Sequence, residues 1–166
     1  MGLFRRLFGN GAPDGFTGVL EPEETVIAHA AVQSGGHLVV TSFGLWVPGA
    51  EPRRIGWHLV SKAKWEGALR LVEAAEVSTE GPVVLLEDLP AHRFALENPE
   101  RVLRAISQRV EGSIRARERV ESPGVWILQR KIPGQDGVVW QARGDAGVDL
   151  ASVREAVRPF AARLAG

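Results

Sequence analysis

The chain has 166 residues, enough for one domain with a substantial core or for one domain with an appendage. Twenty basic and twenty acidic side chains leave no formal net charge, so the overall electrostatic field gives no reason to expect nucleic acid as a partner. The absence of cysteine excludes a disulfide framework and a thiolate metal site. No apolar run approaches the roughly 18 residues of a membrane-spanning helix, and the first residues lack the apolar core of a secretory signal. We therefore expect a cytoplasmic protein, soluble or bound peripherally at the inner face of the membrane.

Residues 1–20 are interpreted as an amphipathic segment followed by a linker. Four large apolar side chains would share one face of a short helix, while two arginines point away from it: Leu3, Phe4, Leu7 and Phe8, with Arg5 and Arg6. One interpretation is weak contact of these six residues with an anionic membrane. The other is a short helix packed on the domain surface, or a frayed chain end.

Residues 37–65 predict strand, tight turn, strand, short loop and strand. A β-branched run at residues 38–40 and an apolar run at residues 45–47 flank a short turn, which favours a hairpin with Gly44 available for positive φ. Apolar side chains then alternate with period two over residues 55–59, as in a strand with one buried face.

Further strands are predicted before and after this stretch, at residues 24–33, 68–73, 83–87 and 91–96. Residues 76–82 are polar and are expected to form a loop. About seven strands with short connections predict one antiparallel sheet that is bent into a partly open barrel or a sandwich.

The hydrophobic period changes from two to that of a helix after residue 98. Asn98 is expected to cap this helix, and Pro99 suits the first helical position. Apolar side chains recur at three- and four-residue steps at Val102, Leu103, Ile106, Val110 and Ile114. We predict one amphipathic helix over residues 99–120 that closes one end of the barrel.

About seven strands followed by one amphipathic helix is similar to the order of elements in the pleckstrin-homology-like fold, which includes the GRAM and bacterial pleckstrin-homology families. The sequence LVVTSFGLWV looks like the second and third strands of those families, and IGWHLVSKAKW looks like the fourth strand and its continuation. The resemblance covers residues 24–120. It implies a domain over residues 21–122, an α+β fold with the helix plugging a bent barrel, and loops at the other end that bind phospholipid head groups or peptides.

Residues 123–166 do not belong to that pattern. Residues 125–131 and 138–143 predict a hairpin, and Asp149 is expected to cap a final helix that kinks at Pro159. We expect this extension to pack on the first domain, because about forty residues bury too little apolar surface to fold alone.

Five tryptophans are numerous for this chain. Trp46, Trp57 and Trp65 lie on predicted strands and are expected in the core. Trp126 and Trp140 lie on opposite arms of the C-terminal hairpin and are expected to pair across it. An exposed tryptophan would instead indicate an aromatic surface for a partner.

Signals for catalysis are weak. The histidines are scattered without metal-ligand spacing, at His29, His37, His58 and His92. Glu87 and Asp88 are neighbours that would point to opposite faces of a strand, so they do not form an acid–base pair. We expect no catalytic residue, metal or cofactor. The alternative is a small enzyme or ligand-binding protein, whose site would be a cluster of these histidines with acidic residues in one cleft.

The candidate partner-binding residues are four cations of the central stretch, Arg53, Arg54, Lys62 and Lys64, for which the simpler interpretation is a solvated face. Phosphoinositide recognition is disfavoured, because the first hairpin turn, QSGGH, has no lysine or arginine and residues 21–98 carry six basic and eleven acidic side chains. We therefore predict a non-enzymatic interaction or scaffolding module that binds a protein partner. The sequence leaves open whether the protein forms a homo-oligomer.

Overall fold

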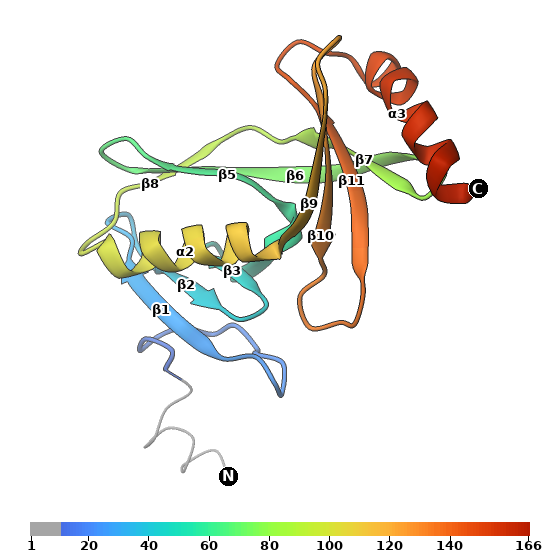
Figure 1. The fold of residues 1–166 in the computed structure, drawn as a ribbon. Coiled ribbons are helices and arrows are strands. Elements are labelled where there is room, and N and C mark those ends of the chain that lie inside the picture. The colour runs from blue at the N-terminus through green and yellow to red at the C-terminus, as the bar shows by residue number, and fades with distance from the viewer. Residues whose placement is uncertain (1–10) are drawn as a thin grey trace.

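The structure, a computed structural model, describes residues 11–166 and is an α+β fold of two sheets and two α-helices (Figure 1). The predicted membrane-contact residues 3–8 lie outside the described residues. This result confirms the predicted fold class, although the strands of residues 24–96 divide between two sheets instead of forming one.

The first sheet is an antiparallel meander of four strands in chain order. Its strands are β1 (Val26–Ala31), β2 (His37–Thr41), β3 (Gly44–Val47) and β4 (Arg53–Gly56). The β2–β3 hairpin forms as predicted, but Gly44 is needed for a different reason than positive φ. A Cβ at Gly44 would overlap the carbonyl oxygen of Ile55 on the neighbouring strand, so the close approach of β3 and β4 requires glycine here.

The second sheet has seven strands in the order β5-β6-β7-β11-β10-β9, with β8 beside the first part of β6. Its strands are β5 (Val60–Trp65), β6 (Leu69–Glu80), β7 (Val83–Asp88), β8 (His92–Phe94), β9 (Ile114–Val120), β10 (Val125–Lys131) and β11 (Val138–Gly144). The pairing of β7 with β11 is parallel and joins the C-terminal hairpin to the earlier strands, whereas the other pairings are antiparallel.

Two α-helices cover different parts of these sheets, α2 (Glu100–Ser113) and α3 (Leu150–Ala165). Strands β9 to β11 stand between α3 on one side and α2 with the first sheet on the other (Figure 1). As predicted, the side chain of Asp149 caps α3, accepting a hydrogen bond from the Ser152 N–H at 2.8 Å. Among residues 11–166, neither helix has the length and apolar character needed to cross a membrane.

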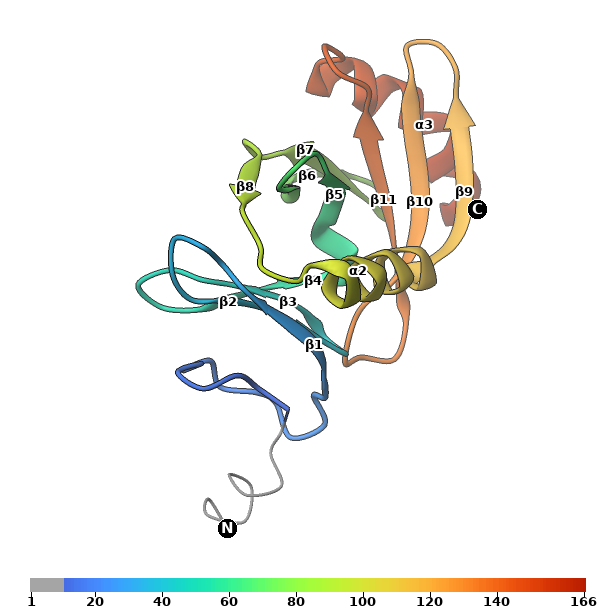
Figure 2. The ribbon, with the colours of Figure 1, turned by 90° about the vertical axis from the view of Figure 1, so that its left-hand side faces the viewer.

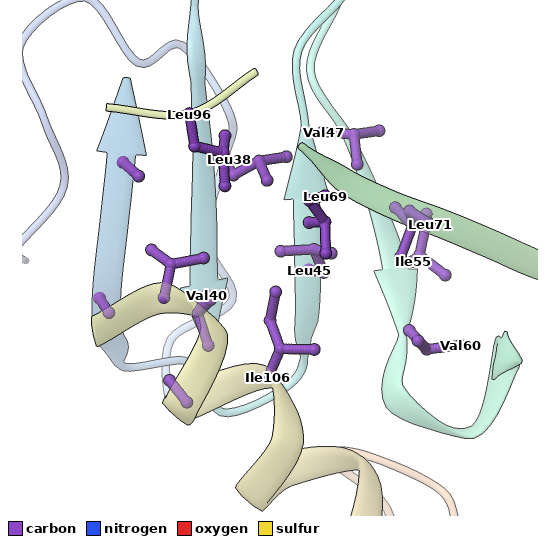
Figure 3. Packing of buried hydrophobic residues seen from close by; sticks show 14 of the residues in the cluster. Leu38, Val40, Leu45, Val47, Ile55, Val60, Leu69, Leu71, Leu96 and Ile106 are labelled. Atoms are coloured by element: carbon purple, nitrogen blue, oxygen red, sulfur yellow. The ribbon is translucent and has the colours of Figure 1, made fainter. Parts of the chain in front are cut away.

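Two separate hydrophobic cores hold the molecule together. The first lies between the first sheet, the beginning of the second sheet and α2 (Figure 3), and includes Leu38, Leu45, Leu69, Leu71 and Ile106. The second lies between α3 and the β7–β11–β10 face, and includes Val83, Leu85, Ile127, Val153 and Val157. Each core contains fully buried aliphatic side chains, which supply most of the favourable free energy of folding.

The predicted strand over residues 55–59 is wrong in its second half, because β4 ends at Gly56 and Trp57–Leu59 form a turn of 3₁₀ helix. This turn carries the chain from the first sheet to the second. Its carbonyl groups are satisfied by the C-terminal hairpin: Arg130 donates to the Trp57 oxygen at 2.7 Å, and Gln141 donates to the His58 oxygen at 2.9 Å. These bonds come from residues more than seventy positions away, so no local pattern could predict them.

The predicted helix is also too long. Helix α2 ends at Ser113, and residues 114–120 form β9 instead, pairing with β10. The predicted Asn98 cap is not formed, because the helix begins at Glu100 without a side-chain cap and Asn98 has a φ of 47°. The polar residues 76–80, predicted as a loop, extend β6, where Ser78 and Thr79 are bound by Arg154 of α3.

The tryptophans follow the predictions in part. Trp46 and Trp57 are buried as expected, whereas 41% of Trp65 is exposed. Trp126 is opposite Arg143 and Trp140 is opposite Gln129, so the two indoles lie on opposite faces of the hairpin and do not pair. Trp140 instead packs edge-on against Phe160 of α3, with ring centroids 4.8 Å apart.

A candidate peptide-binding groove between β5 and α2

Strand β5 is an edge of the seven-stranded sheet. It pairs with β6 on one side, and within residues 11–166 no strand lies on its other side. Figure 2 shows β5 above α2, and the two elements are in contact. The carbonyl groups of Val60 and Ser61 at the start of β5 accept hydrogen bonds from Arg130 and Arg143. An edge strand presents unpaired backbone N–H and C=O groups, so the rest of β5 offers hydrogen-bonding groups to a binding partner.

The core-facing side chains of β5 are not covered. Ala63 and Trp65 are directly opposite Leu71 and Leu69 on β6, so all four point to the same face of the sheet. Leu69 and Leu71 are buried, but Ala63 and Trp65 are exposed. The first core is therefore open along β5.

A groove of about 230 Å³ fills this opening. Its apolar lining comes from both elements: Ala63, Trp65 and Leu69 from the sheet, and Leu103, Ile106 and Val110 from α2. Ser61, Lys62, Ser107 and Glu111 form its polar margin. The spacing of Leu103, Ile106 and Val110 at three and four residues places them on one helix face, which α2 directs toward the sheet.

Among the predicted partner-binding cations, Arg53 and Arg54 are engaged inside the molecule. Arg53 makes two hydrogen bonds with Glu73, at 2.9 and 2.8 Å. Arg54 donates to the buried carboxylate of Glu24 at 2.5 Å and lies over the ring of Trp46. Both arginines therefore have a structural role, and their predicted contact with a partner stays a prediction.

Lys62 and Lys64 are exposed on the outer face of β5, opposite to the face that carries Ala63 and Trp65. The Lys64 ammonium lies 3.6 Å from Glu66, whereas Lys62 makes no ion pair with any described residue. Both lysines are thus beside the candidate groove, where a ligand that lies along β5 can contact Lys62 directly and Lys64 in competition with Glu66. Sequence reasoning selected them by charge alone and missed the apolar groove, which requires the contact between β5 and α2.

Glu24 shows how the molecule stabilises a buried carboxylate. It accepts hydrogen bonds from Thr41 at 2.6 Å, from the Trp46 indole at 2.9 Å and from Arg54. Burial raises the pKa of the Glu24 carboxyl, but the hydrogen bonds from Thr41, from the Glu21 N–H and from Trp46, together with the charge of Arg54, outweigh burial and lower it overall. Glu24 is therefore a charged structural residue that joins the β1 end of the first sheet to β3 and β4.

The histidines are not brought together at one place. The rings of His29 and His37 are 6.1 Å apart, His92 stacks on Phe94, and His58 lies in the 3₁₀ turn before β5. Burial lowers the pKa of His58, with an opposing contribution from Glu76 and a smaller lowering from Arg130. In the described part of the chain, no group of three or more His, Asp or Glu side chains is placed to hold a metal ion.

A larger cavity, of about 590 Å³, lies near the ends of β7 and β11 and is lined by Lys62, Asp88, Trp126, Arg143 and Asp145. Three of its charged side chains are held in ion pairs: Arg143 is 3.6 Å from Asp88, and Asp145 is bound by Arg119. A charged ligand would have to displace these pairs, so the size of this cavity does not make it the better candidate.

Comparison with protein-family models, with curated proteins and with solved structures found no match to this chain. The candidate groove is therefore argued from its own geometry.

Proposed function

We propose that the protein is a non-enzymatic interaction module that binds an extended peptide segment of a protein partner along β5. The observation that carries this proposal is the exposure of Ala63 and Trp65 on the core-facing side of an edge strand. An added strand would satisfy the free backbone groups of β5 and would cover these two residues.

The alternation of side chains along β5 defines the kind of peptide that fits. Side chains of the peptide beside Ala63 and Trp65 enter the apolar groove, and the intervening side chains lie beside Lys62 and Lys64. The proposed ligand therefore alternates apolar and acidic residues. Two copies of β5 would instead place lysines close to lysines, so the charge favours an acidic partner over pairing between identical chains.

The other expectations from sequence accompany this proposal. They are a pleckstrin-homology-like relationship, a cytoplasmic location and weak contact of residues 3–8 with anionic membranes. Co-sedimentation with anionic and neutral vesicles tests the last of these: the proposal expects binding to anionic vesicles that is lost when residues 1–9 are removed. Undiminished binding by the truncated protein would contradict it.

Selection from a displayed library of random peptides, with the full chain as bait, tests the main proposal. We expect selected peptides to alternate apolar and acidic residues and to bind with a Kd on the order of micromolar. Ala63→Asp places a carboxylate in the groove opening and is expected to weaken binding about tenfold or more. Val138→Asp, which adds a carboxylate at an exposed apolar position of β11 outside the groove, is the matched control and should bind as the unmodified protein does.

Two results would overturn the proposal. One is a library that yields no peptide above background. The other is a set of selected peptides that bind the Ala63→Asp variant as tightly as the unmodified protein.

A further inference from the structure

A second site lies at the C-terminal end of α2, away from the β5 groove. Here the end of α2, the start of β9, the end of β10 and the β2–β3 turn enclose a pocket of about 360 Å³. The polar side chains that line it are Ser42, Gln108, Arg109, Ser113, Arg115 and Lys131. We call it the basic pocket, because three of these six residues are cations and none is acidic.

The three cations of the basic pocket are not neutralised by the protein. The side chains of Arg109, Arg115 and Lys131 make no hydrogen bond or ion pair with another residue of the range 11–166. Most other arginines near the second sheet are paired, as Arg117 is with Glu111 and Arg119 is with Asp145. Three cations from three elements therefore converge on one cavity without a counter-ion.

A fourth cation lies beneath the floor of this pocket. Arg130 is only 4% exposed, and its guanidinium donates to the Ser113 hydroxyl at 2.8 and 3.1 Å and to the carbonyl oxygens of Trp57 and Val60. All of these acceptors are neutral. Burial, followed by repulsion from Arg143, lowers the pKa of Arg130 to about 10, against an opposing contribution from the charge of Glu111.

The pocket is built from parts that the fold holds in place. Ser113 lines the pocket, and its hydroxyl accepts a hydrogen bond from Arg130. The same hydroxyl donates to the Val110 oxygen at 2.6 Å, which holds it in place at the end of α2. The β10–β11 turn packs on the β2–β3 turn, where a Cβ at Gly134 would lie 3.0 Å from the Phe43 ring. At Gly112, in contrast, a Cβ would meet no atom within 4 Å, so the mouth of the pocket stays open.

We propose that the basic pocket binds a small phosphorylated ligand through its phosphate or diphosphate group. A phosphate carries about two negative charges and three acceptor oxygens, which match several converging Arg and Lys donors better than a single carboxylate does. The C-terminal end of α2 contributes about half a negative charge, which the three full positive charges outweigh. The volume of the pocket leaves room for a small organic group attached to the phosphate.

The test uses the full chain with pyrophosphate, inorganic phosphate and acetate as probes, measured by titration calorimetry. We expect pyrophosphate to bind most tightly and acetate not to bind. The double variant Arg115→Gln with Lys131→Gln is expected to weaken pyrophosphate binding by more than about tenfold. Arg104→Gln removes an exposed cation from the same helix outside the pocket, and it should leave binding unchanged.

Gly112→Asp gives an independent test, because it adds a carboxylate at the mouth of the pocket, where a Cβ meets no atom within 4 Å. Because the space beside Gly112 accepts at least a Cβ, this variant is expected to weaken pyrophosphate binding while leaving the basic residues in place. Ala63→Asp in the β5 groove should not change pyrophosphate binding, so the two proposed sites can fail separately.

Vesicles of phosphatidylcholine with and without a phosphatidylinositol phosphate distinguish a lipid head group from a free phosphorylated molecule. Vesicle binding that is lost with Arg115→Gln and Lys131→Gln assigns the phosphate to a lipid. Pyrophosphate binding without such vesicle binding assigns it to a soluble ligand. The inference is overturned if pyrophosphate does not bind, or if it binds the double variant and the unmodified protein equally.

Discussion

The two edges of the seven-stranded sheet differ in how their side chains are used. On β9, Arg117 pairs with Glu111, Arg119 pairs with Asp145 and Glu118 is bound by Arg163 of α3. On β5, Lys62 and Lys64 are exposed, with one ion pair between Lys64 and Glu66, and Ala63 and Trp65 lie uncovered beside an apolar groove.

This difference indicates which edge is available to a partner. Charged side chains that are held by ion pairs make an edge strand a poor template for pairing, and β9 has three such contacts. The β5 edge has free backbone groups next to an opening in the core, so a strand added there would bury apolar surface as well as form hydrogen bonds. The predictions below test whether this contrast between β5 and β9 is correct.

Removing residues 123–166 is expected to have the largest effect. The truncated chain would lose β10, β11 and α3, and so the pairing partners of β9 and of one side of β7. Val83 and Leu85, which are fully buried in the second core, would then face solvent. We expect the fragment of residues 1–122 to be insoluble or largely unfolded by circular dichroism. A fragment as stable and soluble as the full chain would contradict this prediction.

Ile106→Ala is expected to have the next largest effect. Ile106 is buried in the first core and also forms the floor of the β5 groove. Its truncation should lower the free energy of unfolding by about 2–5 kcal/mol, measured by urea denaturation. Ser107→Ala, on an exposed neighbouring position of α2, should change the free energy of unfolding by less than about 0.5 kcal/mol. A small effect of Ile106→Ala would show that the groove floor is not a packed core.

Hydrophobic periodicity was sufficient to predict most of the strands, the C-terminal hairpin and the start of α3. It failed at the junction of α2 and β9, because Ile114 fits both the four-residue step from Val110 and the alternation of half-buried and exposed residues that begins with Ile114 and Ala116. Gly112 and Ser113 were the local signal for the end of the helix. The hydrogen bond from Arg130 to Ser113, which fixes the start of β9 against β10, is not local.

The candidate sites were less predictable than the fold. Lys62 and Lys64 were found from their charge, but the groove beside them exists because Ala63 and Trp65 are left uncovered. The basic pocket joins Arg109, Arg115 and Lys131 from three elements, and their convergence depends on the packing of the C-terminal hairpin against α2. Sequence spacing carries no information about such long-range contacts.

A smaller effect is expected from pH, through His58 in the turn that precedes β5. Its pKa is lower in the folded protein than the unfolded value of about 6.5. The unfolded chain therefore binds more protons in this range, so the contribution of His58 to stability is complete above about pH 6.5 and falls as the pH decreases below it. His58→Gln should reduce the loss of unfolding free energy between neutral and mildly acidic pH. The exposed His92→Gln should not, and equal behaviour of the two variants would contradict the prediction.

The smallest effect on stability is expected from Lys62→Glu combined with Lys64→Glu. Both side chains are exposed on the outer face of β5, so the free energy of unfolding should change by less than about 0.5 kcal/mol per site. The specificity of the β5 edge should change, because peptides with basic residues at the alternating outward positions would then be preferred. If the double variant still prefers acidic peptides, the two lysines are not part of the binding site.

Backbone amide mapping by NMR tests the contrast between the two edges most directly. The labelled full chain is titrated with a peptide selected from the displayed library, and amide shifts and hydrogen-exchange protection are recorded along both edge strands. The account predicts shifts and new protection at β5, with shifts in α2 near Leu103 and Ile106, and no change at β9. Protection at β9, or shifts that leave β5 and the groove unaffected, would contradict it.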